Sequence, residues 1–330
     1  MRNNNIYCSK LFWETFSKDR KRLYSSFKEE DLILYRCWIN YFLMLSHSSL
    51  NFEFDEKFIL ESRDETLCQL WHAVASGIKP RSSFNLSCDL NLLESNITTS
   101  PTKDLLNSTY LTDKELKKYS KHGILAVSNE DYLSKVSYFK DSGAALQKKS
   151  NCSWRELLSV AKHLFNALVI VDNWIFSDKT DINLLQILET LLPYEIDIPF
   201  HLTIITSNEK IWSDSELQKK RKAVVSCVEK IRPDLVYRIL IEVFAISKSE
   251  IHDRTIITNY MWIGSGSGFD ILQNNKQTRQ TEATKSTKLS AVFPRFIDDE
   301  EWEKAYDNLI RDCRKALKRI GVTSQNRLLK

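Results

Sequence analysis

The sequence lacks several features that would place it in a class of proteins at once. It has no Cys-x-x-Cys pair, and its seven cysteines are odd in number and widely separated. That pattern favours reduced thiols over a disulfide framework or a zinc site. No stretch approaches the roughly 20 apolar residues that a membrane-spanning helix requires, and residues 1–7 do not lead into an apolar run. We therefore expect a cytoplasmic protein without a transmembrane segment.

Several catalytic signatures are also missing. There is no P-loop, no Gly-x-Gly-x-x-Gly after an early strand, no Gly-x-Ser-x-Gly turn and no His-Glu-x-x-His helix. Residues 264–268 read Gly-Ser-Gly-Ser-Gly, but the Lys-Ser/Thr pair that completes a P-loop does not follow. No cluster of ligand residues suggests a metal. We predict neither a cofactor nor a metal ion.

Charge is present without a strong excess of either sign. The formal net charge is +4, with 27% charged and 42% hydrophobic residues, which is ordinary for a soluble globular protein. The basic residues gather in three clusters, each of which could face phosphates or simply be a solvated helix face. The clusters are Lys18, Arg20, Lys21 and Arg22; Lys219, Lys220, Arg221 and Lys222; and Arg311, Arg314, Lys315, Lys318 and Arg319.

The organisation of the chain changes near residue 150. At 330 residues the chain is long enough for two domains. We expect an α/β protein in which residues 1–150 form an α+β domain of unassigned role. Residues 151–330 alternate strands and helices, which predicts a mixed, largely parallel sheet covered by helices. The expected strands are 168–171, 201–206 and 236–246, and the expected helices are 182–192 and 213–231.

The stretch most suited to chemistry is His252-Asp253-Arg254, followed by Asn259 and a glycine-rich turn, Gly266-Ser267-Gly268. Side chains alternate along a strand, so His252 and Arg254 would point to the same side. A guanidinium binds phosphate with a planar fork of donors, and an imidazole serves as nucleophile or as acid and base. Glycines let backbone N–H groups converge on an anion. The alternative is a structural strand followed by an ordinary turn.

The spacing resembles the phospholipase D superfamily motif, in which a histidine is followed by a lysine two positions on and an aspartate seven positions on, and then by a Gly-Ser pair. His252 and the Gly266-Ser267 pair match, whereas Arg254 replaces the lysine and Asn259 replaces the aspartate. The resemblance implies His252 as nucleophile, Arg254 as phosphate clamp, and Asn259 and Ser267 as supporting groups. An active enzyme with one such motif would need a second copy from a homodimer.

Residues 151–300 are more closely similar to the phospholipase-D-like C-terminal domain of microtubule-interacting-and-trafficking proteins and its bacterial relatives. The shared features are His252-Asp253-Arg254, Trp262-Ile263, the Gly266-x-Gly268-Phe269-Asp270 turn, and a strand at 168–171 that ends in Asp172-Asn173-Trp174. In the eukaryotic members the domain is regarded as a non-catalytic binder of phosphoinositides or membrane. Bacterial relatives tend to occur beside mobile-element or phage-defence proteins.

Two further features bear on this site. Asp172 follows a strand and could orient His252 through a hydrogen bond, or could simply cap the turn that follows. The polar stretch from 273 to 290 lacks periodicity and predicts a mobile loop, which could close over a phosphate ligand or be a disordered insertion.

The sequence leaves three hypotheses. The first is a nucleic-acid-binding protein of a defence or mobile-element system, with a degenerate catalytic motif and with residues 1–150 contacting a partner protein. The second is an active phospholipase-D-type nuclease that works as a homodimer through His252. The third is a module that binds an anionic membrane surface. Loss of the aspartate favours the first, because Asn259 carries no charge to stabilise a histidinium.

Overall fold

The computed structural model describes most of the chain. The described residues are 4–43, 48–77, 83–90, 108–113, 121–133, 145–147, 154–158, 165–176, 181–207, 213–250, 254–265, 269, 272–274, 281–283, 288–292 and 300–330. The chain divides into two compact units, one formed by residues 1–142 and 293–304 and the other by residues 143–292 and 305–330. The α/β class predicted from the sequence is confirmed.

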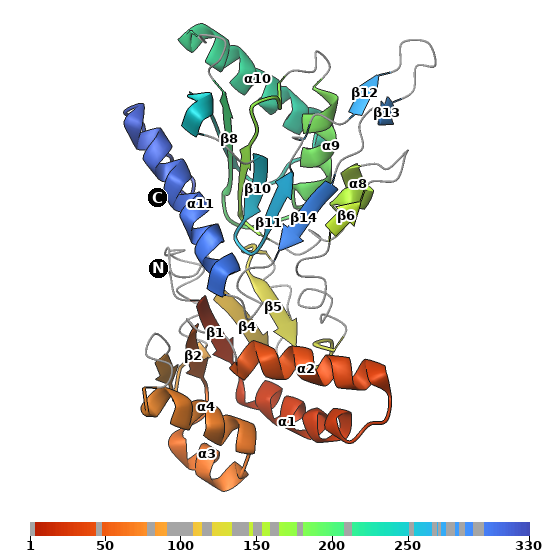
Figure 1. The fold of residues 1–330 in the computed structure, drawn as a ribbon, viewed down its shortest axis with the longest axis vertical. Coiled ribbons are helices and arrows are strands. Elements are labelled where there is room, and N and C mark those ends of the chain that lie inside the picture. The colour runs from red at the N-terminus through yellow and green to blue at the C-terminus, as the bar shows by residue number, and fades with distance from the viewer. Residues whose placement is uncertain are drawn as a thin grey trace. The chain divides into compact units, whose positions relative to one another are not determined.

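The first unit is built on a parallel sheet with the strand order β3-β2-β1-β4-β5 (Figure 1). Its strands are β1 (Asn4–Cys8), β2 (Ser48–Phe52), β3 (Ser83–Asn85), β4 (Ser108–Thr112) and β5 (Leu125–Ser128). Helices α1 (Lys10–Tyr24) and α2 (Glu29–Leu43) connect β1 to β2, and α3 (Glu56–Ser62) and α4 (Glu65–Ala75) connect β2 to β3. Every strand pair is parallel, which differs from the α+β arrangement expected for residues 1–150. The helices lie between the strands in the sequence, and such crossovers produce parallel pairing.

Aromatic side chains dominate the core of this unit. Trp13 of α1 meets the edge of Phe52 on β2, with ring centroids 5.6 Å apart, and Phe12 meets Tyr132 at 5.5 Å. Trp38 of α2 closes the cluster at 5.3 Å from Tyr132. These rings are buried. Burial of such large apolar surfaces is the main stabilising contribution available to a unit of this size.

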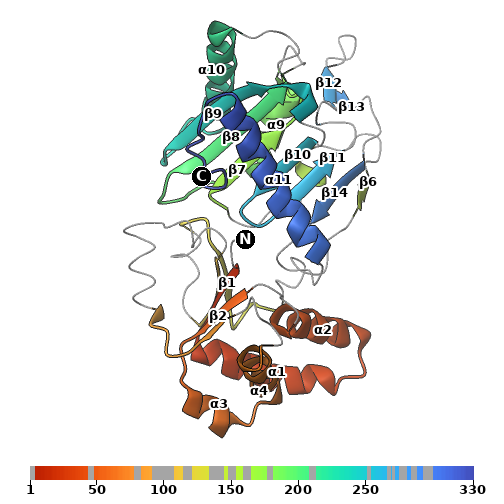
Figure 2. The same ribbon diagram turned by 60° about the vertical axis from the view of Figure 1, so that its left-hand side comes forward.

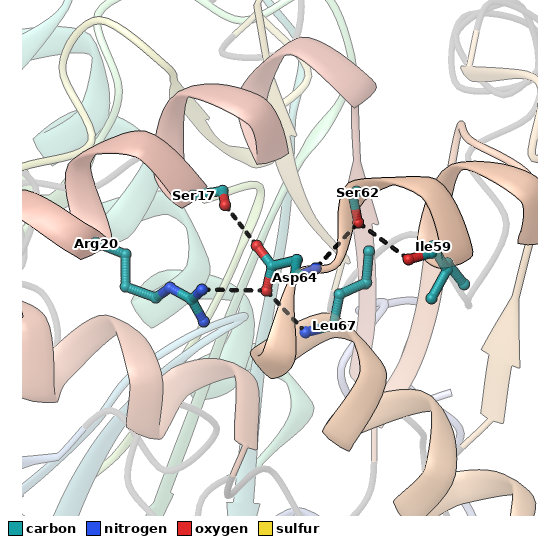
Figure 3. A network of polar contacts seen from close by, with 6 residues as sticks. All are labelled: Ser17, Arg20, Ile59, Ser62, Asp64 and Leu67. Atoms are coloured by element: carbon teal, nitrogen blue, oxygen red, sulfur yellow. Dashed lines mark hydrogen bonds and ion pairs between the residues drawn. The ribbon is translucent and has the colours of Figure 1, made fainter.

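A polar network ties α1 to the corner between α3 and α4 (Figure 3). Asp64 accepts a hydrogen bond from the Leu67 amide at 3.1 Å, which caps the first turn of α4. Its carboxylate also pairs with Arg20 of α1 at 3.3 Å and accepts the hydroxyl of Ser17. Only 3% of the Asp64 side chain is exposed. A buried carboxylate is stable only when its charge and lone pairs are matched in this way.

The second unit contains a mixed sheet with the order β6-β14-β11-β10-β7-β8-β9. Its strands are β6 (Ala145–Gln147), β7 (Ala167–Val171), β8 (Phe200–Ser207), β9 (Ile239–Ile246), β10 (Arg254–Thr258), β11 (Trp262–Ser265) and β14 (Lys288–Val292). The strands β7, β8 and β9 pair in parallel, whereas each remaining pair is antiparallel. The sheet is therefore mixed, as predicted, but its parallel part is confined to β7–β9. The tight turn between β10 and β11 reverses the chain without a crossover helix.

Helices cover both faces of this sheet (Figures 1 and 2). The helices α9 (Ile182–Leu191) and α10 (Asp214–Ile231) lie on one side, near the short α8 (Trp154–Leu157), and α11 (Glu300–Arg319) crosses the other. The α11 side chains Tyr306, Ile310 and Leu317 pack on Val169 and Ile257. The predicted helices and strands of this region are confirmed within a few residues at their ends.

The polar stretch from 273 to 290 is not one uninterrupted loop. Strands β12 (Leu272–Asn274) and β13 (Thr281–Ala283) pair antiparallel, and β14 begins at Lys288 and joins the main sheet. Residues 275–280 and 284–287 lie outside the described part. The stretch lacks the apolar alternation by which strands are recognised in a sequence, so these pairings were not predicted.

Candidate functional site

The candidate site begins with Asp172, directly after the central strand β7. Its backbone N–H donates to the Ile205 carbonyl of β8 at 3.0 Å, so the sheet pairing extends to this residue. The Asp172 side chain is fully buried. An aspartate at the carboxyl end of a parallel strand occupies the edge where ligands of α/β proteins usually bind.

The carboxylate of Asp172 is held by groups from three parts of the chain. Oδ1 accepts the Trp174 amide at 2.8 Å, and Oδ2 accepts the Phe269 amide at 2.6 Å. Arg254 Nε lies 3.9 Å from Oδ1. The Trp174 bond is the turn-capping contact expected as one alternative for this residue. The Phe269 bond anchors the end of the glycine turn, and the 3.9 Å approach places the Arg254 side chain, which is 24% exposed, beside the buried anion.

His252, Asp253 and the turn of Gly266, Ser267 and Gly268 lie outside the described residues. The residues that flank them converge on Asp172. Arg254 follows His252 and pairs in register with Ser265, which precedes the glycine turn. Phe269 follows the turn, donates its amide to Asp172 and packs its ring 5.9 Å from Trp154. One described residue of each predicted motif, Arg254 and Phe269, therefore contacts this one carboxylate.

Asn259 is not brought to the same place. It follows the far end of β10 from Arg254, and a strand of this length separates the two residues by about 16 Å. Its Oδ1 accepts the amides of Asn166 and Ala167 at 3.2 and 3.0 Å, and its Nδ2 donates to Asn166 Oδ1 at 3.1 Å. Asn259 is fully buried. These contacts fix the start of β7 at the edge of the sheet opposite Asp172.

The structure adds cations and an aromatic ring that the motifs did not single out. Trp174 is 41% exposed, and the Lys248 ammonium lies 5.8 Å from its ring centroid. Lys220 of α10 lies 5.1 Å from the ring of Phe176. The sequence signal was the acidic-aromatic step at 172–176, which we used only as part of a family resemblance. Three positive side chains, Lys220, Lys248 and Arg254, thus surround one short turn.

The basic clusters differ in their surroundings. In α11, Arg311 and Lys315 pair with Asp312, Arg319 pairs with Glu250, and Arg314 donates to the Leu328 carbonyl. In α1, Arg20 pairs with Asp64 and Arg22 with Asp19. Much of the charge in these two clusters is therefore matched within the protein. The α10 cluster contributes Lys220 to the candidate site.

Comparison with known proteins adds no assignment. No protein-family model matches the chain, and no curated protein matches it. Among the described residues, no group of His, Cys, Asp and Glu side chains is arranged to hold a metal ion. No helix in the part of the chain that the structure describes is long and apolar enough to cross a membrane.

Proposed function

We propose that the second unit binds a phosphodiester group of a nucleic acid at the Asp172 end of β7. The observation that carries this proposal is the partly exposed Arg254 guanidinium, whose Nε lies 3.9 Å from the fully buried Asp172 carboxylate. An arginine oriented in advance loses little conformational entropy when it binds a planar set of phosphate oxygens.

The electrostatics around Arg254 support the same function. Lys248 and Lys220 add positive charge next to the turn at 172–176, near the rings of Trp174 and Phe176. Cations gathered at a strand edge attract phosphates, and binding then weakens as salt increases. The resemblance of His252-x-Arg254 and Gly266-Ser267 to phospholipase D motifs also supports a phosphodiester ligand. Replacement of the motif's lysine and aspartate favours recognition without efficient cleavage.

The test is binding of labelled single-stranded and double-stranded DNA and RNA by the whole protein, measured by fluorescence anisotropy over a range of salt concentrations. We expect Arg254→Gln to weaken binding about tenfold and to reduce the slope of log K against log salt by about one. Arg311→Gln is the matched control, because it removes an arginine charge from α11, where Arg311 is 57% exposed and contacts Asp312.

The stability of each variant is measured beside its affinity, because Arg254→Gln leaves the Asp172 charge unmatched. Equal affinities of the Arg254 and Arg311 variants would contradict the proposal. Cleavage of the nucleic acid that is lost in His252→Ala would instead identify an active phospholipase-D-type nuclease. Binding to anionic vesicles without binding to nucleic acid would identify a membrane ligand.

A further inference from the structure

Trp174 differs from the other tryptophans whose side chains the structure describes. Trp13, Trp38 and Trp154 are buried, and Trp71 and Trp262 are partly buried, whereas Trp174 is 41% exposed. Exposing a tryptophan ring to water costs free energy that burial would recover. A single exposed aromatic residue is common on protein surfaces, so the exposure alone carries no conclusion. Its surroundings carry the argument.

The backbone of Trp174 is held rigidly at the candidate site. Its amide donates to Asp172 Oδ1 at 2.8 Å, and the same oxygen lies 3.9 Å from Arg254 Nε. The two residues that follow, Ile175 and Phe176, are buried and anchor the turn. The partly exposed ring therefore extends from a backbone that is bonded to the same carboxylate oxygen that Arg254 Nε approaches. A ligand that stacks on the ring therefore causes little further loss of conformational entropy in this segment.

The charge next to the ring matches a nucleotide chain. Lys248 Nζ lies 5.8 Å from the Trp174 ring centroid, and Lys248 is exposed on the 3-10 turn Lys248–Glu250. An unpaired base has an apolar face that stacks on an aromatic ring, and the phosphates on either side of it need cations. A base inside a duplex is already stacked on both faces and is not available to the ring.

We propose that Trp174 stacks against an unpaired base of single-stranded DNA or RNA, while Arg254 binds an adjacent phosphate and Lys248 neutralises the chain beside it. This inference rests on the proposed function and names its substrate class. It distinguishes a single-stranded nucleic acid from a duplex and from a lipid headgroup, because neither of those presents a free base to the ring.

The test compares two fluorescein-labelled oligonucleotides of equal length, a single-stranded polythymidine and an abasic strand with the same phosphates. We expect the whole protein to bind the polythymidine about tenfold more tightly than the abasic strand, as expected for stacking of one base. Trp174→Ala removes that preference and leaves the affinity for the abasic strand unchanged. Trp174→Phe keeps most of the preference, because a smaller ring still stacks.

Tyr194→Ala is the matched control. Tyr194 is 79% exposed and has the Arg232 guanidinium 4.1 Å from its ring centroid, but it precedes β8 and so lies at the opposite edge of the parallel strands. This variant keeps the preference for bases. If Trp174→Ala also keeps it, while Arg254→Gln weakens binding of both strands, phosphodiester recognition stands and the stacking role is overturned. If the unmodified protein binds neither strand, the stacking proposal is overturned, and the measurements with duplex DNA and with RNA decide whether phosphodiester recognition stands.

Discussion

Asp172 shows how a single buried residue defines this site. A carboxylate without solvent is costly unless donors or cations surround it. Here the donors are the amides of Trp174 and Phe269, and the cation is Arg254. The same contacts that stabilise the anion therefore place an exposed ring, the end of the glycine turn and a guanidinium together. Structural and functional demands on Asp172 are met by one set of interactions.

Two threonines of β10 test how the hydrogen bonding of a buried hydroxyl group affects stability. Thr255 and Thr258 are both fully buried. The Thr255 hydroxyl has no hydrogen-bond partner among the residues that the structure describes, whereas Thr258 Oγ1 accepts the amides of Tyr260 and Met261 at 3.2 and 3.0 Å. We expect Thr255→Val to raise the free energy of unfolding by about 1 kcal/mol and Thr258→Val to lower it by about 1–2 kcal/mol.

Urea titration followed by circular dichroism measures both threonine variants against the unmodified protein. The two substitutions are chemically identical and lie on one strand, so differences in strand propensity and in the unfolded chain cancel. A Thr255→Val variant that is destabilised as much as Thr258→Val would show that the Thr255 hydroxyl is satisfied in solution.

At the scale of elements, the sequence predicted the alternation of the second unit well. Apolar β-branched runs identified β7 and β8, and Ser213 with Glu216 marks the start of α10, where the structure has a full capping box. Local patterns of this kind depend on neighbouring residues alone. The strand order of the first unit depends on pairings between distant residues, which no local pattern specifies. The position of Asn259 relative to Arg254 could have been foreseen, because the four strand residues between them, 255–258, carry the chain to the other edge of the sheet.

The junction between α1 and α4 provides a test at the scale of elements. Asp64 caps α4, pairs with Arg20 and accepts from Ser17, whereas Asp55 is exposed and caps α3 through the Phe58 amide at 3.0 Å. We expect Asp64→Ala to cost about 3 kcal/mol, since it removes a cap and leaves Arg20, 12% exposed, without its partner. Asp55→Ala removes a cap alone and costs about 1 kcal/mol.

The effect of each cap on its helix is measured by hydrogen exchange of the backbone amides in the whole protein. Peptides from the second unit serve as an internal reference. Asp64→Ala should accelerate exchange in both α1 and α4, and Asp55→Ala in α3 alone. The ion pair with Arg20 would contribute nothing to the junction if the two variants accelerated exchange equally and if each did so only in the helix that its aspartate caps.

At the scale of the whole second unit, the last residues of the chain complete the sheet face beside α11. Asn326 Nδ2 donates to the Leu168 carbonyl and to Thr203 Oγ1, each at 3.1 Å. Glu242 accepts the Gln325 amide at 2.8 Å and the Thr203 hydroxyl at 3.0 Å. The segment after α11 is thus joined to β7, β8 and β9 at once. Its position also places Arg327 and Lys330 near His201.

His201 makes the stability of this unit depend on pH. The pKa of His201 is lowered to about 4, chiefly by burial and also by the positive charges of Arg327 and Lys330, while a hydrogen bond with the Gln325 backbone partly opposes them. The unfolded chain, with an ordinary histidine pKa near 6.5, binds the proton more readily between about pH 4 and 6.5. The contribution of His201 to the free energy of unfolding is therefore fully present above about pH 6.5. It decreases as the pH falls, by about 2 kcal/mol at pH 5. We expect His201→Gln to remove this part of the pH dependence. Urea titrations at pH 7.5 and 5 measure the free energy of unfolding of the second unit in the unmodified protein and in the His201→Gln variant. Equal losses of this free energy in the two proteins would show that His201 titrates alike in the folded and unfolded chains.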